Sequence, residues 1–130
     1  MHIPPSNKPA ARILIVEDDD AIRSLYELKL QMEGFDTATA VNGLLGLRAA
    51  KEFQPDVILL DLRMPVMSGD EMLLRLREAA WGSNMRVIIL TNISKSEAPH
   101  SLRFLHVDRY IVKVHTTPAQ VVSTVKEVIG

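Results

Sequence analysis

At 130 residues the chain has the length of one ordinary domain, and it can bury enough apolar surface to fold without a disulfide or a metal. A net charge of −1 gives no basic footprint for nucleic acid, and the lack of cysteine excludes disulfide scaffolds, thiolate metal sites and cysteine nucleophiles. No apolar run reaches bilayer length and no signal pattern opens the chain, so we expect a cytoplasmic protein without membrane or direct nucleic-acid contact.

Short apolar runs alternate with helical patterns along the chain. Residues 1–11 hold three prolines and no periodic pattern, which predicts a flexible lead-in to a single domain at residues 12–130. The apolar runs predict five strands, at 13–16, 37–41, 57–60, 87–90 and 110–112. The amphipathic stretches predict five helices, at 20–33, 43–50, 70–80, 96–105 and 118–128.

Caps and apolar stripes support these helices. Asp19 or Asp20 is expected to cap the first helix, with Asp20 favoured, and Thr117 to cap the last, with Pro118 in its first position. Pro99 fits the fourth helix only within the first turn. The inward stripe of the first helix is expected to consist of Ile22, Leu25, Leu28 and Met32.

The alternation of strands and helices predicts an α/β fold with a parallel sheet. Right-handed crossovers then restrict the topology to a doubly wound five-stranded sheet with helices on both faces. Ligands of such sheets bind beyond the carboxyl ends of the strands. The residues that the predicted strands leave at that edge are Glu17, Asp18 and Asp19, then Asp61, Thr91 and Lys113.

This set of side chains suits phosphoryl transfer. Clustered carboxylates repel one another unless a cation joins them, and a few hard, partly hydrated oxygen ligands favour Mg²⁺. With the cation present, Asp61 can remain ionised and attack phosphorus, while Lys113 offsets charge on the phosphoryl oxygens. Thr91 can donate its hydroxyl to another of these oxygens.

Four motifs carry a family resemblance. They are ILIVEDD at 13–19, VILLDLRMPVMSGDEML at 57–73, VIILT at 87–91 and YIVK at 110–113. In this order and spacing the sequence resembles response-regulator receiver domains of two-component signalling, from Arg12 to Ile129. The resemblance implies a flavodoxin-like sheet of order 2-1-3-4-5.

The resemblance also implies a role for each matching residue. Asp61 becomes the phosphoacceptor, with Thr91 as the switch hydroxyl, Lys113 as the phosphate counter-ion and Tyr110 as the aromatic that changes rotamer. The Mg²⁺ ligands become Asp61, Asp18, Glu17 through water, and the backbone carbonyl of Arg63. A sensor histidine kinase or histidine phosphotransfer protein would donate the phosphoryl group, and a homodimer or an output domain would receive the signal through the surface around Tyr110 and the last two helices.

The chain departs from the family pattern in three places. Val114 replaces the proline that usually follows the lysine, Asn92 replaces an alanine, and His106-Val107 replaces Gly-Ala. Because a cis bond before a residue other than proline costs roughly 2.5–4 kcal/mol, we expect a trans bond between Lys113 and Val114. These departures bear on loop movement rather than on the acids.

Two other classes of protein share part of this set of residues. Aspartate-nucleophile hydrolases also use a parallel sheet and Mg²⁺, but they carry D-x-D after the first strand, whereas Asp61 follows the third strand as D-L-R. A receiver-like interaction module without phosphorylation would not need the complete set of Asp18, Asp61, Thr91 and Lys113. The sequence therefore favours a phosphoacceptor signalling domain over an enzyme acting on other substrates.

Overall fold

The computed structural model describes residues 9–130, so most of the predicted lead-in at 1–11 lies outside the described residues. Five strands form one parallel sheet in the order β2-β1-β3-β4-β5, as expected. Their bounds are β1 Arg12–Val16, β2 Asp36–Ala40, β3 Val57–Leu60, β4 Arg86–Thr91 and β5 Arg109–Val112. Strand β3 is buried along its whole length, as a central parallel strand should be.

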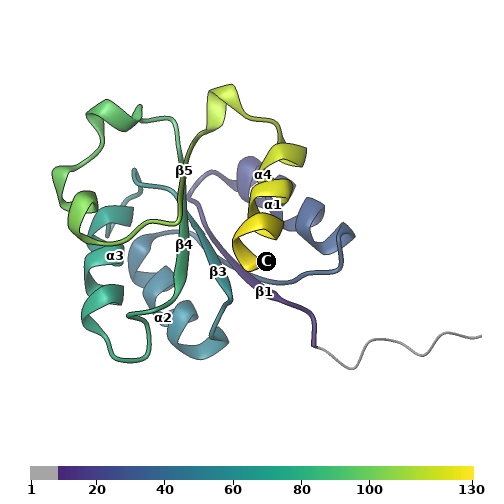
Figure 1. The fold of residues 1–130 in the computed structure, drawn as a ribbon, viewed down its shortest axis with the longest axis horizontal. Coiled ribbons are helices and arrows are strands. Elements are labelled where there is room, and N and C mark those ends of the chain that lie inside the picture. The colour runs from purple at the N-terminus through teal and green to yellow at the C-terminus, as the bar shows by residue number, and fades with distance from the viewer. Residues whose placement is uncertain (1–8) are drawn as a thin grey trace, which may run out of the picture.

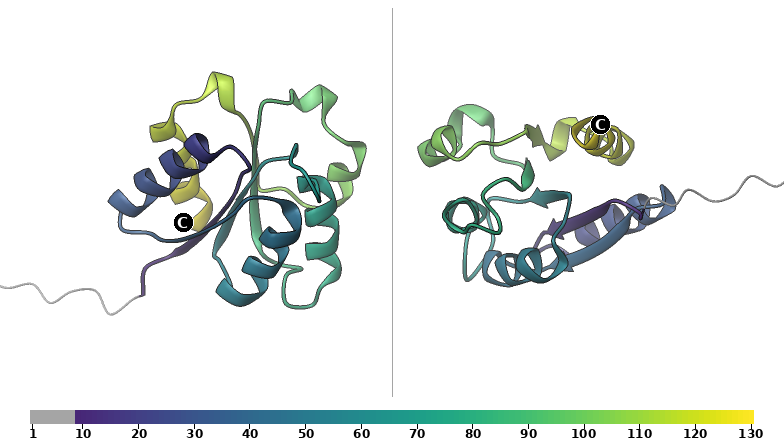
Figure 2. Two further views of the ribbon diagram at one scale, coloured as in Figure 1. Left: turned by 180° about the vertical axis from the view of Figure 1, so that it is seen from behind. Right: turned by 60° about the horizontal axis from the view of Figure 1, so that its bottom comes forward.

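Four α-helices cover the two faces of the sheet (Figures 1 and 2). They are α1 Asp20–Met32, α2 Gly43–Phe53, α3 Gly69–Glu78 and α4 Pro118–Ile129. Helices α1 and α4 pack on one face, and α2 and α3 on the other. The doubly wound flavodoxin-like architecture is therefore confirmed.

Side-chain caps set where these helices begin. Asn42 and Ser68 accept hydrogen bonds from backbone N–H groups in the first turns of α2 and α3. Thr117 and Gln120 form a reciprocal capping box at the start of α4, where Pro118 takes the first position. The expected start of the last helix is thus confirmed.

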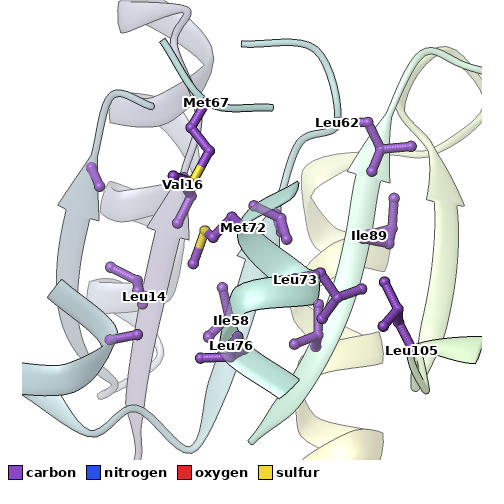
Figure 3. Packing of buried hydrophobic residues seen from close by; sticks show 14 residues of the cluster. Leu14, Val16, Ile58, Leu62, Met67, Met72, Leu73, Leu76, Ile89 and Leu105 are labelled. Atoms are coloured by element: carbon purple, nitrogen blue, oxygen red, sulfur yellow. The ribbon is translucent and has the colours of Figure 1, made fainter. Parts of the chain in front are cut away.

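The core lies in two layers separated by the sheet. Figure 3 shows the layer under α2 and α3, where Leu14, Ile58 and Ile89 of the strands meet Met72 and Leu76 of α3. In the layer on the opposite face, Tyr26 and Leu30 of α1 and Val121 and Val125 of α4 belong to one buried cluster. Burial on both faces explains why the strands read as continuous apolar runs.

The expected inward stripe of α1 is wrong for three of its four residues, and only Ile22 packs against the core. Leu25, Leu28 and Met32 are 41%, 54% and 71% exposed, whereas Tyr26 and Leu30 are buried against the sheet. The helix carries two apolar stripes, and periodicity alone does not say which of them the sheet covers. The larger Tyr26 and the fully buried Leu30 take the inner side.

The helix expected at 96–105 is also wrong. The segment forms two 3₁₀ turns, Lys95–Glu97 and His100–Phe104, separated at Pro99. Proline lacks an N–H group and disfavours the helical conformation of the residue before it, and Ala98 is accordingly extended, with φ −63° and ψ 150°. The side of the sheet beside β5 therefore has less helical cover than expected.

Two further expectations concern the backbone and the membrane. Residues 9–130 contain no cis peptide bond, so the bond between Lys113 and Val114 is trans, and a 3₁₀ turn follows at Lys113–His115. Within the same residues, no helix has both the length and the apolar character that a bilayer crossing requires.

Candidate functional site

The acidic residues converge where β1 and β3 end side by side. Residues 13–16 of β1 are in register with 57–60 of β3, so the residues that follow these strands meet at the sheet's carboxyl edge. Carboxylate oxygens of Glu17, Asp18 and Asp61 lie within 4.8 Å of one another. Glu17 and Asp61 are 3% and 8% exposed, while Asp18 faces solvent.

Lys113 reaches this cluster from the end of β5. Its ammonium nitrogen Nζ lies 3.2 Å from Oδ2 of Asp61 and also contacts Oε1 of Glu17. The other oxygen of Asp61, Oδ1, accepts a hydrogen bond of 2.7 Å from the backbone N–H of Leu62. Asp61 is thus held from both sides as a carboxylate at the end of the central strand.

Burial and charge act against each other in this cluster. Burial raises the pKa of the Glu17 carboxyl to about 7; the negative charge of Asp61 acts in the same direction, and the hydrogen bond from Lys113 opposes both. Burial alone would lower the pKa of Lys113, but its contacts with Glu17 and Asp61 outweigh burial and raise that pKa. The ammonium therefore stays charged beside the acids.

Asp18 and Arg63 lie in the same surface groove. This groove has a volume of about 630 Å³ and runs from Asp18 past the loop after β3 to Ile93 and Glu97. Arg63 lines this groove together with Leu62 and Asp18, which places the loop after β3 near the acids. The groove adjoins the acidic cluster, because Asp18 belongs to both.

Thr91 and Tyr110 lie beside the cluster on the β4–β5 side. Thr91 ends β4, is buried, and its hydroxyl oxygen lies 3.5 Å from the backbone nitrogen of Ile93. The Tyr110 hydroxyl donates a hydrogen bond of 2.7 Å to the carbonyl of Ile93. A continuous path of contacts therefore connects Thr91 to Tyr110 through one short loop.

Arg23 is a residue of the site that the sequence analysis missed. Its guanidinium donates to the backbone carbonyls of Glu17 at 2.9 Å and Asp18 at 3.5 Å, and pairs with Asp20. Of the two acids expected to cap α1, Asp19 is the cap and the favoured Asp20 is not, because the Asp19 side chain accepts from the N–H of Ile22. Arg23 lies one turn into α1, and its acceptors are backbone carbonyls that no residue type in the sequence marks.

The donor set fits a hard divalent cation. Three carboxylates converge, one of them solvent-facing, and no thiolate or imidazole is among them. Glu17, Asp18, Asp61 and the carbonyl of Arg63 would hold Mg²⁺. When bound, the ion would offset the repulsion among the acids and the charge of phosphoryl oxygens.

We expect Mg²⁺ affinity to depend on pH through Glu17. Its pKa of about 7 means that a proton occupies the carboxyl below this pH and competes with the cation. The affinity should fall about tenfold per unit as the pH drops below about 7 and level off above it. Calorimetric titration with Mg²⁺ between about pH 6 and pH 8 measures this dependence.

Glu17→Gln is the matched control, since it keeps the size of the side chain and removes its titration. This variant should bind Mg²⁺ more weakly and with a flatter pH profile. An affinity of the unsubstituted protein that stays constant over this pH range would contradict the expectation.

The fold and the site define a class of protein. A doubly wound parallel sheet whose carboxyl edge carries three acids, a buried hydroxyl and an ammonium is a flavodoxin-like domain whose acidic cluster could hold a metal ion. The model of the response regulator receiver domain family matches residues 13–126, and the chain belongs to this family. It is therefore a receiver domain of two-component signalling, a phosphoacceptor domain rather than an enzyme in the usual sense.

Curated relatives and solved structures agree with this assignment. The chain is 36% identical over 115 residues to the transcriptional regulatory protein PrrA of Mycobacterium tuberculosis, covering 88% of this chain and 48% of PrrA. It superposes on the Vibrio cholerae chemotaxis protein CheY4 with a TM-score of 0.84 at 28% identity, covering 92% of this chain and 98% of that one. The receiver domain of the Pseudomonas aeruginosa sensor kinase PA1611, which holds a magnesium ion in its cleft, has a TM-score of 0.83 at 24% identity and covers 93% and 98%.

One expectation about partners is wrong. The chain is 39% identical over 84 residues to the "DNA-binding dual master transcriptional regulator RpaA" of Synechocystis, and this alignment covers 65% of the chain and 35% of RpaA. Relatives that bind DNA contradict the exclusion of nucleic acid from the partners. The chain spans less than half the length of these relatives, so the net charge of this one domain could not reveal that partner.

Proposed function

We propose that Asp61 accepts a phosphoryl group from the histidine of a sensor kinase or of a histidine phosphotransfer protein, in the cytoplasm and with Mg²⁺ bound. The observation that carries the proposal is the environment of Asp61. It is a buried carboxylate at the end of the central strand, 3.2 Å from an ammonium and within reach of two further acids.

The residues around Asp61 have complementary tasks. One carboxylate oxygen of Asp61 forms the new P–O bond, while the P–N bond to the donor histidine breaks and its electron pair remains on the imidazole nitrogen. Lys113 offsets charge on the phosphoryl oxygens, and Glu17, Asp18 and the Arg63 carbonyl hold the cation. The chain thereby catalyses its own phosphorylation.

Thr91 and Tyr110 supply the switch. A phosphoryl oxygen on Asp61 would accept a hydrogen bond from the Thr91 hydroxyl and draw the loop at Ile93 toward the site. That loop carries the carbonyl to which Tyr110 donates, so its movement changes the rotamer preference of Tyr110. The signal leaves through the surface formed by Tyr110, the 95–105 segment and α4.

The names of the relatives support a proposal about the output. PrrA and RpaA are named as regulators of transcription, which supports the proposal that this receiver also controls a transcriptional output. Reading the open reading frame past codon 130 tests this part, because a DNA-binding domain encoded there would support it and its absence would oppose it.

The phosphoacceptor role has a direct test. After treatment with acetyl phosphate and Mg²⁺, intact-mass measurement should show one added phosphoryl group. The group should be absent when a chelator removes the cation, because the clustered acids then repel the anionic donor.

Asp61→Asn is the matched variant, since it keeps the shape of the side chain and removes the nucleophile. It should gain no phosphoryl group while keeping the circular dichroism spectrum of the unsubstituted protein. Phosphoryl addition to Asp61→Asn would transfer the role to another residue and overturn the proposal.

A further inference from the structure

The outer edge of β5 lies open between two grooves. Strand β5 pairs only with β4 among the described residues, so one row of its backbone N–H and C=O groups faces outward. Figure 2 shows β5 at this edge, with the 95–105 segment on one side and α4 on the other. Tyr110 lines both grooves, which places the strand at their shared border.

The first groove lies beside the two 3₁₀ turns that follow β4. It has a volume of about 710 Å³ and lies between the 95–105 segment and β5. Leu102, Val107 and Tyr110 give it an apolar floor. The chain between the 3₁₀ turns and β5 is held by Arg77, which donates hydrogen bonds of 3.0 Å and 2.7 Å to the carbonyls of Leu105 and His106.

The lining of this groove is positively charged. Lys95, Arg103 and Arg109 line it, and none of them forms a salt bridge to a carboxylate of residues 9–130. The one acid of the lining, Asp108, already accepts a hydrogen bond of 2.8 Å from the N–H of Val87 and lies beside His106. The Arg109 guanidinium also donates a hydrogen bond of 2.7 Å to the backbone carbonyl of Asp108. With three cations and one carboxylate, the lining keeps a net positive charge of two.

The second groove is polar and contains one carboxylate. It has a volume of about 520 Å³, lies between β5 and α4, and is lined by the hydroxyl-bearing residues Thr116, Ser123 and Thr124 together with Gln120, His115 and Glu127. The two sides of the β5 edge thus differ in chemistry. The basic groove attracts negative charge, whereas Glu127 makes the second groove better suited to small polar side chains than to acidic ones.

We propose that an extended acidic segment of a partner protein adds to β5 as a sixth strand. Side chains of a strand alternate between its two faces, so every second residue of the segment would enter the basic groove and the others the hydroxyl-lined groove. The free backbone groups of β5 would supply main-chain pairing, and the three cations would select for acidic residues. The apolar floor of the first groove favours a peptide over a nucleic acid.

The site is connected to the phosphorylation site, and this regulatory part depends on the proposed function. Tyr110 borders both grooves and donates to the carbonyl of Ile93, in the loop that follows Thr91. A segment bound along β5 therefore contacts the residue whose rotamer phosphorylation is proposed to change. By linkage, phosphorylation of Asp61 and binding of the segment alter each other's equilibrium by the same factor.

Binding can be measured with a labelled peptide of about ten residues in which threonine alternates with glutamate. Fluorescence anisotropy should show saturable binding to the unphosphorylated protein and to Asp61→Asn, so this result does not depend on phosphorylation. A peptide with lysine in place of glutamate should bind at least about tenfold more weakly. Amide hydrogen exchange at β5 should slow on binding, because strand addition pairs the outward N–H groups.

The variants K95E/R103E and R48E/K51E separate the groove from total charge. Both reverse two exposed cations, but only the first pair lines the groove, so it alone should weaken peptide binding by about tenfold or more. Four results would overturn the proposal: equal loss in both variants, unchanged exchange at β5, equal binding of the lysine peptide, or tighter binding of a DNA duplex. Self-association of the protein that K95E/R103E abolishes would identify a second copy as the occupant and would also overturn it.

Discussion

Replacing Arg77 by alanine is expected to destabilise the domain by about 3 kcal/mol, although the residue lies far from the acidic cluster. The side chain extends from α3 and donates to five backbone carbonyls. The acceptors are the carbonyl oxygens of Gly82, Ser83, Met85, Leu105 and His106. One guanidinium thus joins the end of α3 to the segments that precede β4 and β5.

The size of this effect follows from what the substitution leaves behind. Burial lowers the pKa of Arg77, with the charge of Asp108 acting in the opposite direction, so the cation is partly withdrawn from water. Removal of the donors leaves several carbonyls without partners in that environment. Lysine carries a single ammonium rather than a planar fork, so Arg77→Lys should restore only part of the stability.

Arg75→Ala is the matched control on the same helix. Arg75 is exposed and makes one ion pair with Glu71 at 3.0 Å, so its loss should cost at most about 0.5 kcal/mol. Urea unfolding followed by circular dichroism measures both changes. Equal losses in the two variants would show that the five bonds of Arg77 add no stability.

The residues of the site could be predicted because each follows an apolar strand. A parallel sheet brings the ends of its strands to one edge, so Glu17, Asp61 and Lys113 could be brought together from the order of the elements alone. The distances among them were not predictable. They depend on the register of β1 with β3 and on the direction that Lys113 takes after β5.

The wrong expectations have a common physical cause. Periodicity shows that a helix has an apolar side, but α1 has two, and the choice of Tyr26 and Leu30 over Leu28 depends on how the helix docks on the sheet. Pro99 was compatible with the helix expected at 96–105 only within its first turn, and nothing in the sequence showed that two 3₁₀ turns would form instead. Local patterns do not encode contacts with distant segments.

The same limit explains the two arginines that the sequence analysis missed. Arg23 and Arg77 both act by donating to backbone carbonyls. A carbonyl is present at every residue, so no residue type in the sequence marks the acceptor. Such side chains become visible only when the loops that they hold have been placed.

Gly69→Ala is expected to affect stability and phosphorylation together. Gly69 opens α3, and a Cβ atom at this position would lie 2.0 Å from the carbonyl oxygen of Asp61 and 2.9 Å from the Cα of Leu62. Both neighbours are backbone atoms in the buried loop after β3, so neither can rotate away. We expect a loss of about 3 kcal/mol in the free energy of unfolding, as in other overpacked cores.

The functional part of this prediction concerns the protein that remains folded. To accommodate the methyl group, α3 must move away from the backbone of Asp61, and the carboxylate must shift with respect to Glu17 and Lys113. A displacement of about 1 Å can cost about a hundredfold in rate, so acetyl phosphate should label folded Gly69→Ala far more slowly than the unsubstituted protein.

Gly34→Ala is the control. Gly34 has φ +90°, but no atom lies within 4 Å of the added carbon. We therefore expect only backbone strain of about 1 kcal/mol and a normal labelling rate. Labelling is followed by intact mass under conditions in which circular dichroism shows each variant folded. A normal rate in folded Gly69→Ala would mean that the position of Asp61 does not depend on its close contact with α3.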